Sequence, residues 1–475
     1  MKRIVLKPRE ERRILMGHPW VYDNEIASIL AGSGTVAKLA TLEPGELADV
    51  ESSNKKYLGR SFVNPNSKIT ARIYSPSKEG VDKGFFKRRI REAILKRMPP
   101  GNGISPGQAG YDLSMESARL VFAEADFLPG LIIDRFVGWP LDAIEASIIE
   151  RPVRFKAIET SLGSPASWVS IQFLSWGMDE RREMILDALE EVLAVPLLPG
   201  QAPLCPPTGI IEKSGVKVRA LEGLPLQEGL VRGSFPHAGI VIFENELPFV
   251  VHLEESQKTG HFLDQRDNRR LATAYFLKYL DAGLKAGIAD SVTPKGQAGE
   301  PKVLDACAYT GSFGIHAAIA GASSVTCVDV SAPALETLKK NAALNGVSEV
   351  IKTVEADVFE YLRAAERKKE RYDLIILDPP AFAKTKASLD GAIRGYKEIN
   401  IRAISLLKNG GILVTCSCSQ AMDETRFKTM ITEAAADAER RLIQLDFRYQ
   451  AGDHPILIGF DESFYLKCGF YRAID

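Results

Sequence analysis

Residues 303–314 read Val-Leu-Asp-Ala-Cys-Ala-Tyr-Thr-Gly-Ser-Phe-Gly, so that a short apolar strand runs through a turn directly into a helix. Gly311 lets the backbone pass close to a ligand, and the first turn of the helix offers unpaired N–H groups. The stretch matches neither GxGxxG, the pattern of dinucleotide sites, nor GxxxxGK(S/T), the pattern of nucleoside triphosphate sites. It predicts a ligand site of another kind at the end of a strand.

Strands alternate with helices on both sides of this stretch. Strands are expected at 303–306, 324–330, 350–355, 374–377 and 411–415, and helices at 314–320, 332–345 and 399–407. Such alternation predicts an α/β fold with a doubly wound, Rossmann-like and largely parallel sheet. Ligands of these sheets bind outside the carboxyl ends of the strands.

The chain before this region has two different patterns. Over residues 1–75, short β-like runs alternate with Gly, Pro and Asn turns, which predicts a small barrel or sandwich. A basic amphipathic helix is expected at 83–98, followed by strands at 130–134 and 168–173 and a helix at 184–195. We therefore predict a small β domain at 1–78, a central α+β domain at 79–243 and a catalytic domain at 244–475.

Composition excludes several classes of protein. The 475 residues are 45% hydrophobic and 25% charged, and 60 Lys and Arg oppose 61 Asp and Glu, which is ordinary for a globular chain. No apolar run reaches the about 20 residues of a membrane span, and the first residues lack an apolar signal core, so a cytoplasmic location without membrane contact is expected. Six cysteines without a CxxC pair make a disulfide framework or a metal site improbable.

Charge is unevenly distributed along the chain. The first hundred residues hold 20 basic and 11 acidic side chains, so the remainder is acidic. This asymmetry favours a module that faces phosphates, although a solvated charged face is the alternative. Candidate RNA-binding residues are Arg12, Arg13, Lys55, Lys56, Arg88, Arg89 and Arg91. His18, Trp20 and Tyr22 either stack on bases or pack inside the small β domain.

Three acids follow three successive strands. Asp305 lies in the first strand. Asp329 ends the second strand, about 20 residues after the glycine-containing turn, and Asp357 follows the third strand. A carboxylate at such a position can accept hydrogen bonds from both ribose hydroxyls. Each acid alone fits a turn or a helix cap. Together they predict a nucleoside pocket.

The fourth strand ends in Asp378-Pro-Pro-Ala-Phe382, where two prolines hold the aspartate rigidly at the ligand edge. An acid-rich nucleoside pocket with Asp-Pro-Pro-x-Phe resembles the class I S-adenosylmethionine-dependent methyltransferases that modify a planar base. In that family the aspartate and the Pro-Pro backbone bind the base edge or its amino group. A rigid turn with a core Phe is the alternative.

Residues 413–419 read Leu-Val-Thr-Cys-Ser-Cys-Ser and place Cys418 near the end of a further strand. A thiolate there could attack carbon 6 of a cytosine and make carbon 5 nucleophilic toward a sulfonium methyl group. Cysteines in apolar strands are mostly buried and inert, which is expected of Cys307, Cys327 and Cys416.

The resemblance covers the whole chain and points to the ribosomal RNA large-subunit methyltransferase I family. Lys7-Pro8 with Gly17-His-Pro-Trp-Val-Tyr22 resembles its N-terminal PUA module, 123–135 its central domain, and 253–269 the hairpin and helix before its catalytic sheet. Residues 391–400 and Asp453-His454-Pro455 match as well, and Cys418 lies where that family has Ser-Cys-Ser.

The resemblance implies a large-subunit ribosomal RNA substrate, S-adenosylmethionine as cofactor and 5-methylcytosine as product, formed through a covalent adduct on Cys418 with Asp378 holding the cytosine. It implies that Pro380 and Phe382 contact the substrate. The residues that it places around the cofactor are Gln265, Arg266, Asp305, Tyr309, Thr310, Gly311, Phe313, Asp329, Asp357, Asp378 and Pro379.

Two other functions stay open. A base N-methyltransferase also uses an Asp-Pro-Pro-x-Phe motif and needs no cysteine, and a non-catalytic ribosome-assembly factor could keep the cofactor pocket. An NAD-dependent oxidoreductase is disfavoured because the glycine fingerprint is absent. The sequence leaves open the modified nucleotide, the base that removes the C5 proton, and whether the chain forms a homodimer.

Overall fold

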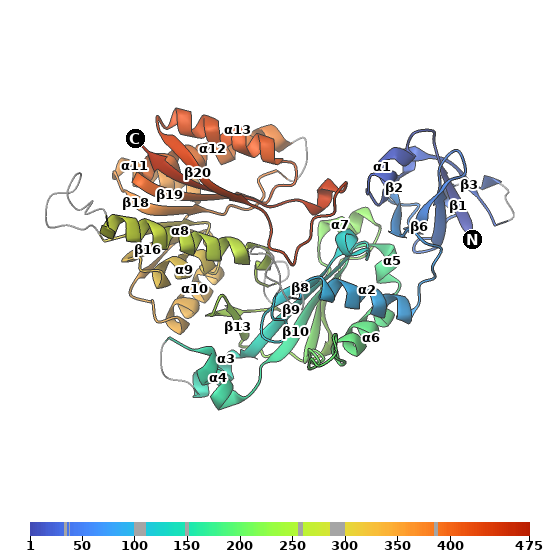
Figure 1. Ribbon diagram of the computed structural model, residues 1–475, viewed down its shortest axis with the longest axis horizontal. Helices are drawn as coiled ribbons and strands as arrows, with labels where there is room; N and C mark the ends of the chain where they lie inside the picture. The colour runs from blue at the N-terminus through green and yellow to red at the C-terminus, as the bar shows by residue number, and fades with distance from the viewer. Residues whose placement is uncertain are drawn as a thin grey trace.

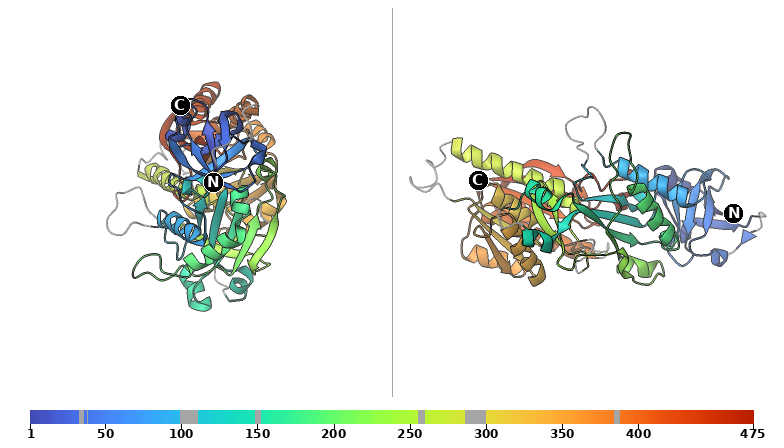
Figure 2. Two further views of the ribbon diagram at one scale, coloured as in Figure 1. Left: turned by 90° about the vertical axis from the view of Figure 1, so that its right-hand side faces the viewer. Right: turned by 90° about the horizontal axis from the view of Figure 1, so that it is seen from below.

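The computed structural model describes residues 1–32, 36–37, 39–98, 111–147, 152–254, 260–285, 300–383 and 388–475. Three sheets of seven strands each follow one another along the chain. They lie along the longest axis of the molecule, with the second sheet between the first and the third (Figures 1 and 2). In these described residues, no helix has both the length and the apolar content needed to cross a membrane.

The first sheet lies within residues 2–75 and has the strand order β2-β7-β6-β5-β1-β3-β4. Its core consists of apolar side chains such as Ile4, Val21, Val50 and Ala71. The strands are β1 (Lys2–Leu6), β2 (Trp20–Tyr22), β3 (Ile26–Leu30), β4 (Val36–Ala37), β5 (Leu47–Glu51), β6 (Tyr57–Val63) and β7 (Ile69–Ser75), with one short helix, α1 (Glu11–Leu15). The small, strand-rich unit predicted for this part is thus present.

The second sheet has the order β12-β11-β10-β9-β13-β14, and β8 pairs with β9. Its strands are β8 (Ala118–Phe122), β9 (Leu131–Pro140), β10 (Ala166–Phe173), β11 (Gly209–Lys213), β12 (Glu228–Gly233), β13 (Ile240–Glu244) and β14 (Leu247–Val251). Its helices are α2 (Lys83–Leu95), α3 (Leu141–Ser147), α4 (Phe155–Leu162), α5 (Trp176–Asp179), α6 (Arg182–Leu193) and α7 (Lys217–Leu221). The predicted domain limit between residues 243 and 244 falls inside β13, which pairs with β9, so a limit after β14 fits this sheet better.

The third sheet has the order β17-β16-β15-β18-β19-β21-β20, and β21 runs antiparallel to both its neighbours. Its strands are β15 (Lys302–Ala306), β16 (Ser324–Asp329), β17 (Ile351–Glu355), β18 (Tyr372–Leu377), β19 (Leu407–Ser417), β20 (Arg441–Arg448) and β21 (Lys467–Ile474). Helices α8 (Arg266–Lys285), α9 (Ser312–Ile319) and α10 (Ala332–Leu344) cover one face, and α11 (Val358–Arg367), α12 (Leu389–Leu406) and α13 (Glu424–Asp437) cover the other (Figure 1). This is the predicted doubly wound sheet.

The second and third sheets share one hydrophobic core. Phe136, Ile242 and Phe249 of the second sheet belong to the same buried cluster as Phe276 of α8 and Ile315 of α9. The first sheet joins the second in a similar way, since its Phe62 and Tyr74 lie in the cluster that α2 and α6 form with the second sheet. Contacts of this kind fix the three sheets relative to one another.

A long connection between β20 and β21, residues 449–466, leaves the third sheet and reaches the first; we call it the arm (Figure 1). Phe460 of the arm packs edge-on against Trp20 and His18, with ring centroids 4.8 and 5.2 Å apart. The His18 ring lies 3.4 Å from the carboxylate of Glu462. The arm therefore ties the first sheet to the third.

Asp453 of the arm is a buried meeting point of the central and C-terminal parts of the chain. Its backbone carbonyl accepts a hydrogen bond from Arg97 at the end of α2, and its side chain accepts one from the backbone N–H of Arg119 in β8. Burial acts to raise the pKa of Asp453, but His454 at 2.7 Å and Arg266 at 3.8 Å outweigh burial and hold that pKa well below its ordinary value.

Candidate active site

The turn between β15 and α9 has an unusual backbone. Cys307, Tyr309 and Gly311 have φ values of +63°, +50° and +81°. The left-handed region costs non-glycine residues of order 1 kcal/mol each, and such strain is concentrated at functional sites. A Cβ on Gly311 would lie 2.4 Å from Cγ of Leu338, so only glycine fits here. The turn thus brings the start of α9 to the carboxyl edge of the sheet.

Asp305 is fully buried at this edge, and its Oδ2 accepts a 2.8 Å hydrogen bond from the N–H of Gly314. Burial, together with the negative charges of Asp378 and Asp329, raises the pKa of Asp305 to about 7. Asp329, at the end of β16, accepts a hydrogen bond from the N–H of Tyr309 at 2.8 Å. Both acids therefore shape the turn as well as the pocket.

Asp357 is exposed and caps α11, because its Oδ1 accepts hydrogen bonds from the first backbone N–H groups of that helix at 2.8 and 3.2 Å. The four acids nevertheless converge. Burial raises the pKa of the Cys307 thiol, and the charges of Asp329, Asp378, Asp305 and Asp357 act in the same direction. The charges of carboxylates predicted from separate strands thus all act on the Cys307 thiol.

Gln265 joins this group from the start of α8. Its Nε2 donates a 3.0 Å hydrogen bond to Oδ1 of Asp378, and its Oε1 accepts one of 2.6 Å from Asn268. Arg266 points elsewhere: it donates to the carbonyl of Ser117, and its guanidinium lies over the Tyr111 ring at 4.3 Å. The structure thus brings Gln265 to Asp378, whereas Arg266 faces the central part of the chain.

The other predicted cofactor residues line the same turn. The Tyr309 ring packs edge-on against Phe262 at 5.1 Å, and the Thr310 carbonyl accepts a 2.9 Å hydrogen bond from Asn341. Phe313 is buried, with the guanidinium of Arg269 5.6 Å from its ring. Phe313 therefore belongs to the core beneath the site.

Cys418 and Cys416 have different environments. Cys416 is completely buried and its Sγ lies 3.3 Å from Sγ of Cys468 on β21, and burial raises the pKa of its thiol. Cys418 is half-buried just past the end of β19, and its Sγ lies 3.8 Å from the carbonyl of Pro379. The structure places Cys418 beside the carbonyl of Pro379 in the Asp-Pro-Pro motif, whereas Cys416 lies inside the sheet next to Gln265.

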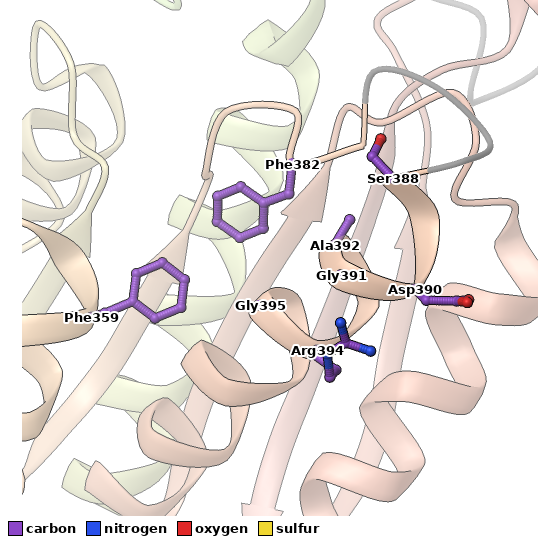
Figure 3. Close-up of a pocket in the computed structure, with 8 residues that line it drawn as sticks. All are labelled: Phe359, Phe382, Ser388, Asp390, Gly391, Ala392, Arg394 and Gly395. Carbon is purple, nitrogen blue, oxygen red and sulfur yellow. The ribbon is translucent and has the colours of Figure 1, made fainter.

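A pocket of about 610 Å³ opens beside this motif. The rings of Phe359 and Phe382 form one wall, 5.9 Å apart, and Figure 3 shows them on one side of the start of α12. Gly391 and Gly395 line the pocket from α12 with backbone only, and Arg394 between them in the chain is exposed. Of the two prolines, Pro379 is buried and Pro380 is exposed.

The predicted RNA-binding residues fall into two groups. Arg12, Lys55 and Lys56 are exposed. The others, of which Arg88 and Arg91 are also exposed, form ion pairs or hydrogen bonds within the protein: Arg13 with Glu25 at 2.7 Å, Arg88 and Arg89 with Glu79, and Arg91 with the carbonyl of Leu197. For the helix at 83–95, these contacts favour the alternative of a solvated interdomain helix.

Trp20 is packed inside the molecule. Its Nε1 donates a 2.8 Å hydrogen bond to Glu124 of the central part, and the guanidinium of Arg72 lies 4.9 Å from its ring. His18 is buried, and Tyr22 lies under Arg13 at 4.7 Å. These contacts favour internal packing over base stacking.

Two residues of the site region are absent from the sequence-based predictions. Lys467 is buried at the start of β21, and Arg394 lies at the rim of the pocket. Lys467 has a visible signal, since it is the only cation in the apolar run 464–471. No local pattern marks Arg394 as a site residue, because its position at the rim of the pocket depends on how α12 packs.

Comparisons with known proteins agree with this geometry. The PUA-like domain family matches residues 4–76, and a family described as conserved hypothetical protein 95 matches 287–434. The ribosomal RNA large subunit methyltransferase I of Shewanella denitrificans is 37% identical over 467 residues, 98% of each chain.

Among solved structures, a Streptococcus mutans protein provisionally assigned as a SAM-dependent methyltransferase has a TM-score of 0.69 at 18% identity, over 99% of this chain and all of that one. A methyltransferase, also provisionally assigned and complexed with SAH, has a TM-score of 0.71 at 19% identity with the same coverage. These structures share the fold. Because the chain is 37% identical to the Shewanella denitrificans protein over 98% of each chain, it belongs to the ribosomal RNA large subunit methyltransferase I family.

Proposed function

We propose that this chain transfers a methyl group from S-adenosylmethionine to carbon 5 of a cytosine in large-subunit ribosomal RNA, with Cys418 as the covalent nucleophile. The observation that carries the proposal is the position of Cys418 beside Pro379 of the Asp-Pro-Pro motif. Family membership supports the methyl transfer and the RNA substrate, because the curated relative has that name.

The residues at the strand ends fit the cofactor. S-adenosylmethionine carries a positive sulfonium, an ammonium and a ribose with two hydroxyls, and it supplies an electrophilic methyl group. Asp305, Asp329 and Asp357 offer carboxylates whose charges all act on Cys307, and such groups suit a cation and ribose hydroxyls. Of the three, Asp329 would hold the ribose, and the strained turn at 307–311 would follow the cofactor closely.

Cys418 and Asp378 would act on the cytosine. The Cys418 thiolate attacks carbon 6, so that the S–C6 bond forms and the C5–C6 π electrons move to carbon 5. Carbon 5 then takes the methyl group, and the bond between methyl and sulfonium breaks with its electrons on sulfur. Transfer of the C5 proton to water restores the C5–C6 double bond, and the S–C6 bond breaks with its electrons on the sulfur of Cys418. Gln265 holds the Asp378 carboxylate in place for the base.

The pocket beside Phe382 would receive RNA next to the target. An aromatic ring stacks on a base with about 1–3 kcal/mol, and the rings of Phe359 and Phe382 both line the pocket. The exposed guanidinium of Arg394 is suited to a phosphate. Together these groups would hold a nucleotide that flanks the cytosine and would help keep the cytosine out of its stack.

The experiment is transfer of labelled methyl from S-adenosylmethionine to unmodified ribosomal RNA, followed by nucleoside analysis. Wild type, Cys418→Ala and Cys416→Ala are compared. We expect 5-methylcytidine from wild type and from Cys416→Ala, and none from Cys418→Ala.

Other outcomes would overturn parts of the proposal. Loss of product only in Cys416→Ala would make Cys416 the nucleophile. An N-methylated base from all three proteins would establish a base N-methyltransferase without a covalent adduct. If wild type fails to bind S-adenosylmethionine or to methylate any RNA, a non-catalytic ribosome-assembly factor is the function that remains.

A further inference from the structure

Lys467 is a buried cation at the same strand end as Cys418. It is the first residue of β21 and is 1% exposed. In the antiparallel ladder between β19 and β21, Lys467 faces Ser417, and Cys468 faces Cys416. The chain leaves β19 at Ser417 and continues at once into Cys418, so Lys467 enters the sheet where the proposed nucleophile leaves it.

The described contacts of Lys467 are with neutral groups. Its Nζ donates hydrogen bonds of 2.7 Å to the carbonyl of Ser419 and of 2.7 Å to the carbonyl of Tyr465. Among the described residues, no carboxylate lies within 4.0 Å of this ammonium. Burying a charge without a counter-ion costs several kcal/mol, so an amine in this position calls for an anion nearby.

Cys418 is the group that can supply this anion. Burial lowers the pKa of Lys467 to about 8, and the charge of Cys418 acts in the opposite direction. An amine with this pKa is still mainly protonated at pH 7. The hydrogen bond to the carbonyl of Ser419 holds the residue after Cys418, so the same ammonium also fixes the turn that carries the thiol.

Other titratable groups face this thiol as well. Tyr396 donates or accepts a 2.9 Å hydrogen bond with Ser419 Oγ, and burial raises its pKa, so it stays neutral. Asp378 precedes the proline whose carbonyl Cys418 contacts, and its negative charge opposes ionisation of the thiol. The Lys467 ammonium acts against that effect.

We infer that Lys467 is a positioning residue for the reaction, in which its ammonium stabilises the thiolate of Cys418 and fixes the turn on which that thiolate lies. The inference rests on the proposed function for its role in catalysis. When the thiol ionises, the S–H bond breaks and the proton goes to water, while Lys467 keeps all its protons. The thiolate is then ready to form the bond to carbon 6.

The test is the rate of alkylation of Cys418 by iodoacetamide between pH 5.5 and 10, followed for each cysteine by peptide mass spectrometry, without RNA or cofactor. In wild type we expect the midpoint for Cys418 below the ordinary thiol value of about 8.5. Cys205, which is exposed, is an internal reference. Lys467→Met should raise the Cys418 midpoint by about one pH unit and slow its alkylation at pH 7 about tenfold.

Lys408→Met is the matched control. Lys408 lies at the opposite end of β19 and pairs with Asp373 at 2.7 Å, so its loss should leave the Cys418 profile unchanged. Lys467→Arg keeps the charge and should keep the midpoint near that of wild type. An equal midpoint in wild type and Lys467→Met overturns the inference.

The wild-type profile tests the inference even if Lys467→Met does not fold, because a Cys418 midpoint at or above that of Cys205 would also overturn it. The result is separable from the proposed function. If Lys467→Met alters the alkylation profile of Cys418 but wild type makes no 5-methylcytidine, the proposed reaction is rejected and the effect of Lys467 stands. If wild type makes 5-methylcytidine but Lys467→Met leaves the profile unchanged, only the role of Lys467 is rejected.

Discussion

The sulfur atoms of Cys416 and Cys468 lie 3.3 Å apart on facing residues of β19 and β21, inside the sheet. A thiol in this position packs against the neighbouring strand and has no exposed surface. We therefore expect its part in the protein to be structural.

Replacing Cys416 by Ala should lower the free energy of unfolding by about 1 kcal/mol, because the change removes one buried sulfur from a close-packed core. Methyl transfer should continue at a rate near that of wild type. Urea unfolding and a methyl transfer assay on the same preparation check the two parts. A stable Cys416→Ala protein without activity would contradict this assignment.

Stability should depend on pH through Asp305. Its pKa is raised from 3.8 to about 7 in the folded protein, so the folded state binds the proton more tightly than the unfolded state. The stabilisation is complete below pH 4 and is lost as the pH rises through 7, on the order of 2 kcal/mol between pH 5 and pH 8. Asp305→Asn should remove most of this dependence, as measured by urea unfolding of cofactor-free protein at four pH values. An unchanged slope in the variant would assign the pH dependence to other groups.

The docking of the arm should depend on Gly459. A Cβ at this position would lie 1.9 Å from the carbonyl of Met16, and φ is +86°. Gly200 has a φ of +80°, and a Cβ there would have no neighbouring atom within 4 Å, so Gly200→Ala is a control for backbone strain alone. We expect Gly459→Ala to be about 2 kcal/mol less stable than Gly200→Ala, with faster proteolysis of the arm. Equal stability of the two variants would show that the arm can shift at no energetic cost.

RNA affinity should depend on salt through exposed lysines. Lys55 and Lys56 are exposed, whereas Arg89 pairs with Glu79 at 2.9 Å. Each side chain that neutralises a phosphate contributes about 0.7 to the slope of log K against log salt. The double change of Lys55 and Lys56 to Ala should therefore lower the slope, and Arg89→Ala should not. Fluorescence anisotropy with a ribosomal RNA fragment at several salt concentrations measures both slopes, and an effect of Arg89→Ala alone would place the RNA on α2 instead.

The sequence predicts the five parallel strands of the catalytic sheet well because each of them carries a local signal, whereas the antiparallel strands β20 and β21 are absent from the predictions. An apolar run that ends in Asp329, Asp357 or Asp378 needs no knowledge of distant residues, and parallel strands bring such ends to one edge. The strand order confirms that expectation. The roles of the single side chains at the site remain predictions.

Features that depend on distant pairing are not visible in the sequence. Lys467 is separated from Cys418 by 49 positions, and only the antiparallel pairing of β21 with β19 brings the two together. Likewise, Arg266 lies next to Gln265 in the chain but faces Ser117 and Tyr111, because successive residues of a helix point in different directions. Family resemblance names Gln265 and Arg266 together without showing this difference.

The core shared by the second and third sheets limits how this protein can be divided. A fragment that begins near residue 244 would lack Phe136 and Trp168 of the cluster that covers α8 and α9, and would expose that apolar face to water. The catalytic sheet is therefore not a detachable module. Any fusion or truncation that separates the third sheet from the second should yield an aggregated protein. Changes that keep residues 111–475 together preserve the interface between the two sheets.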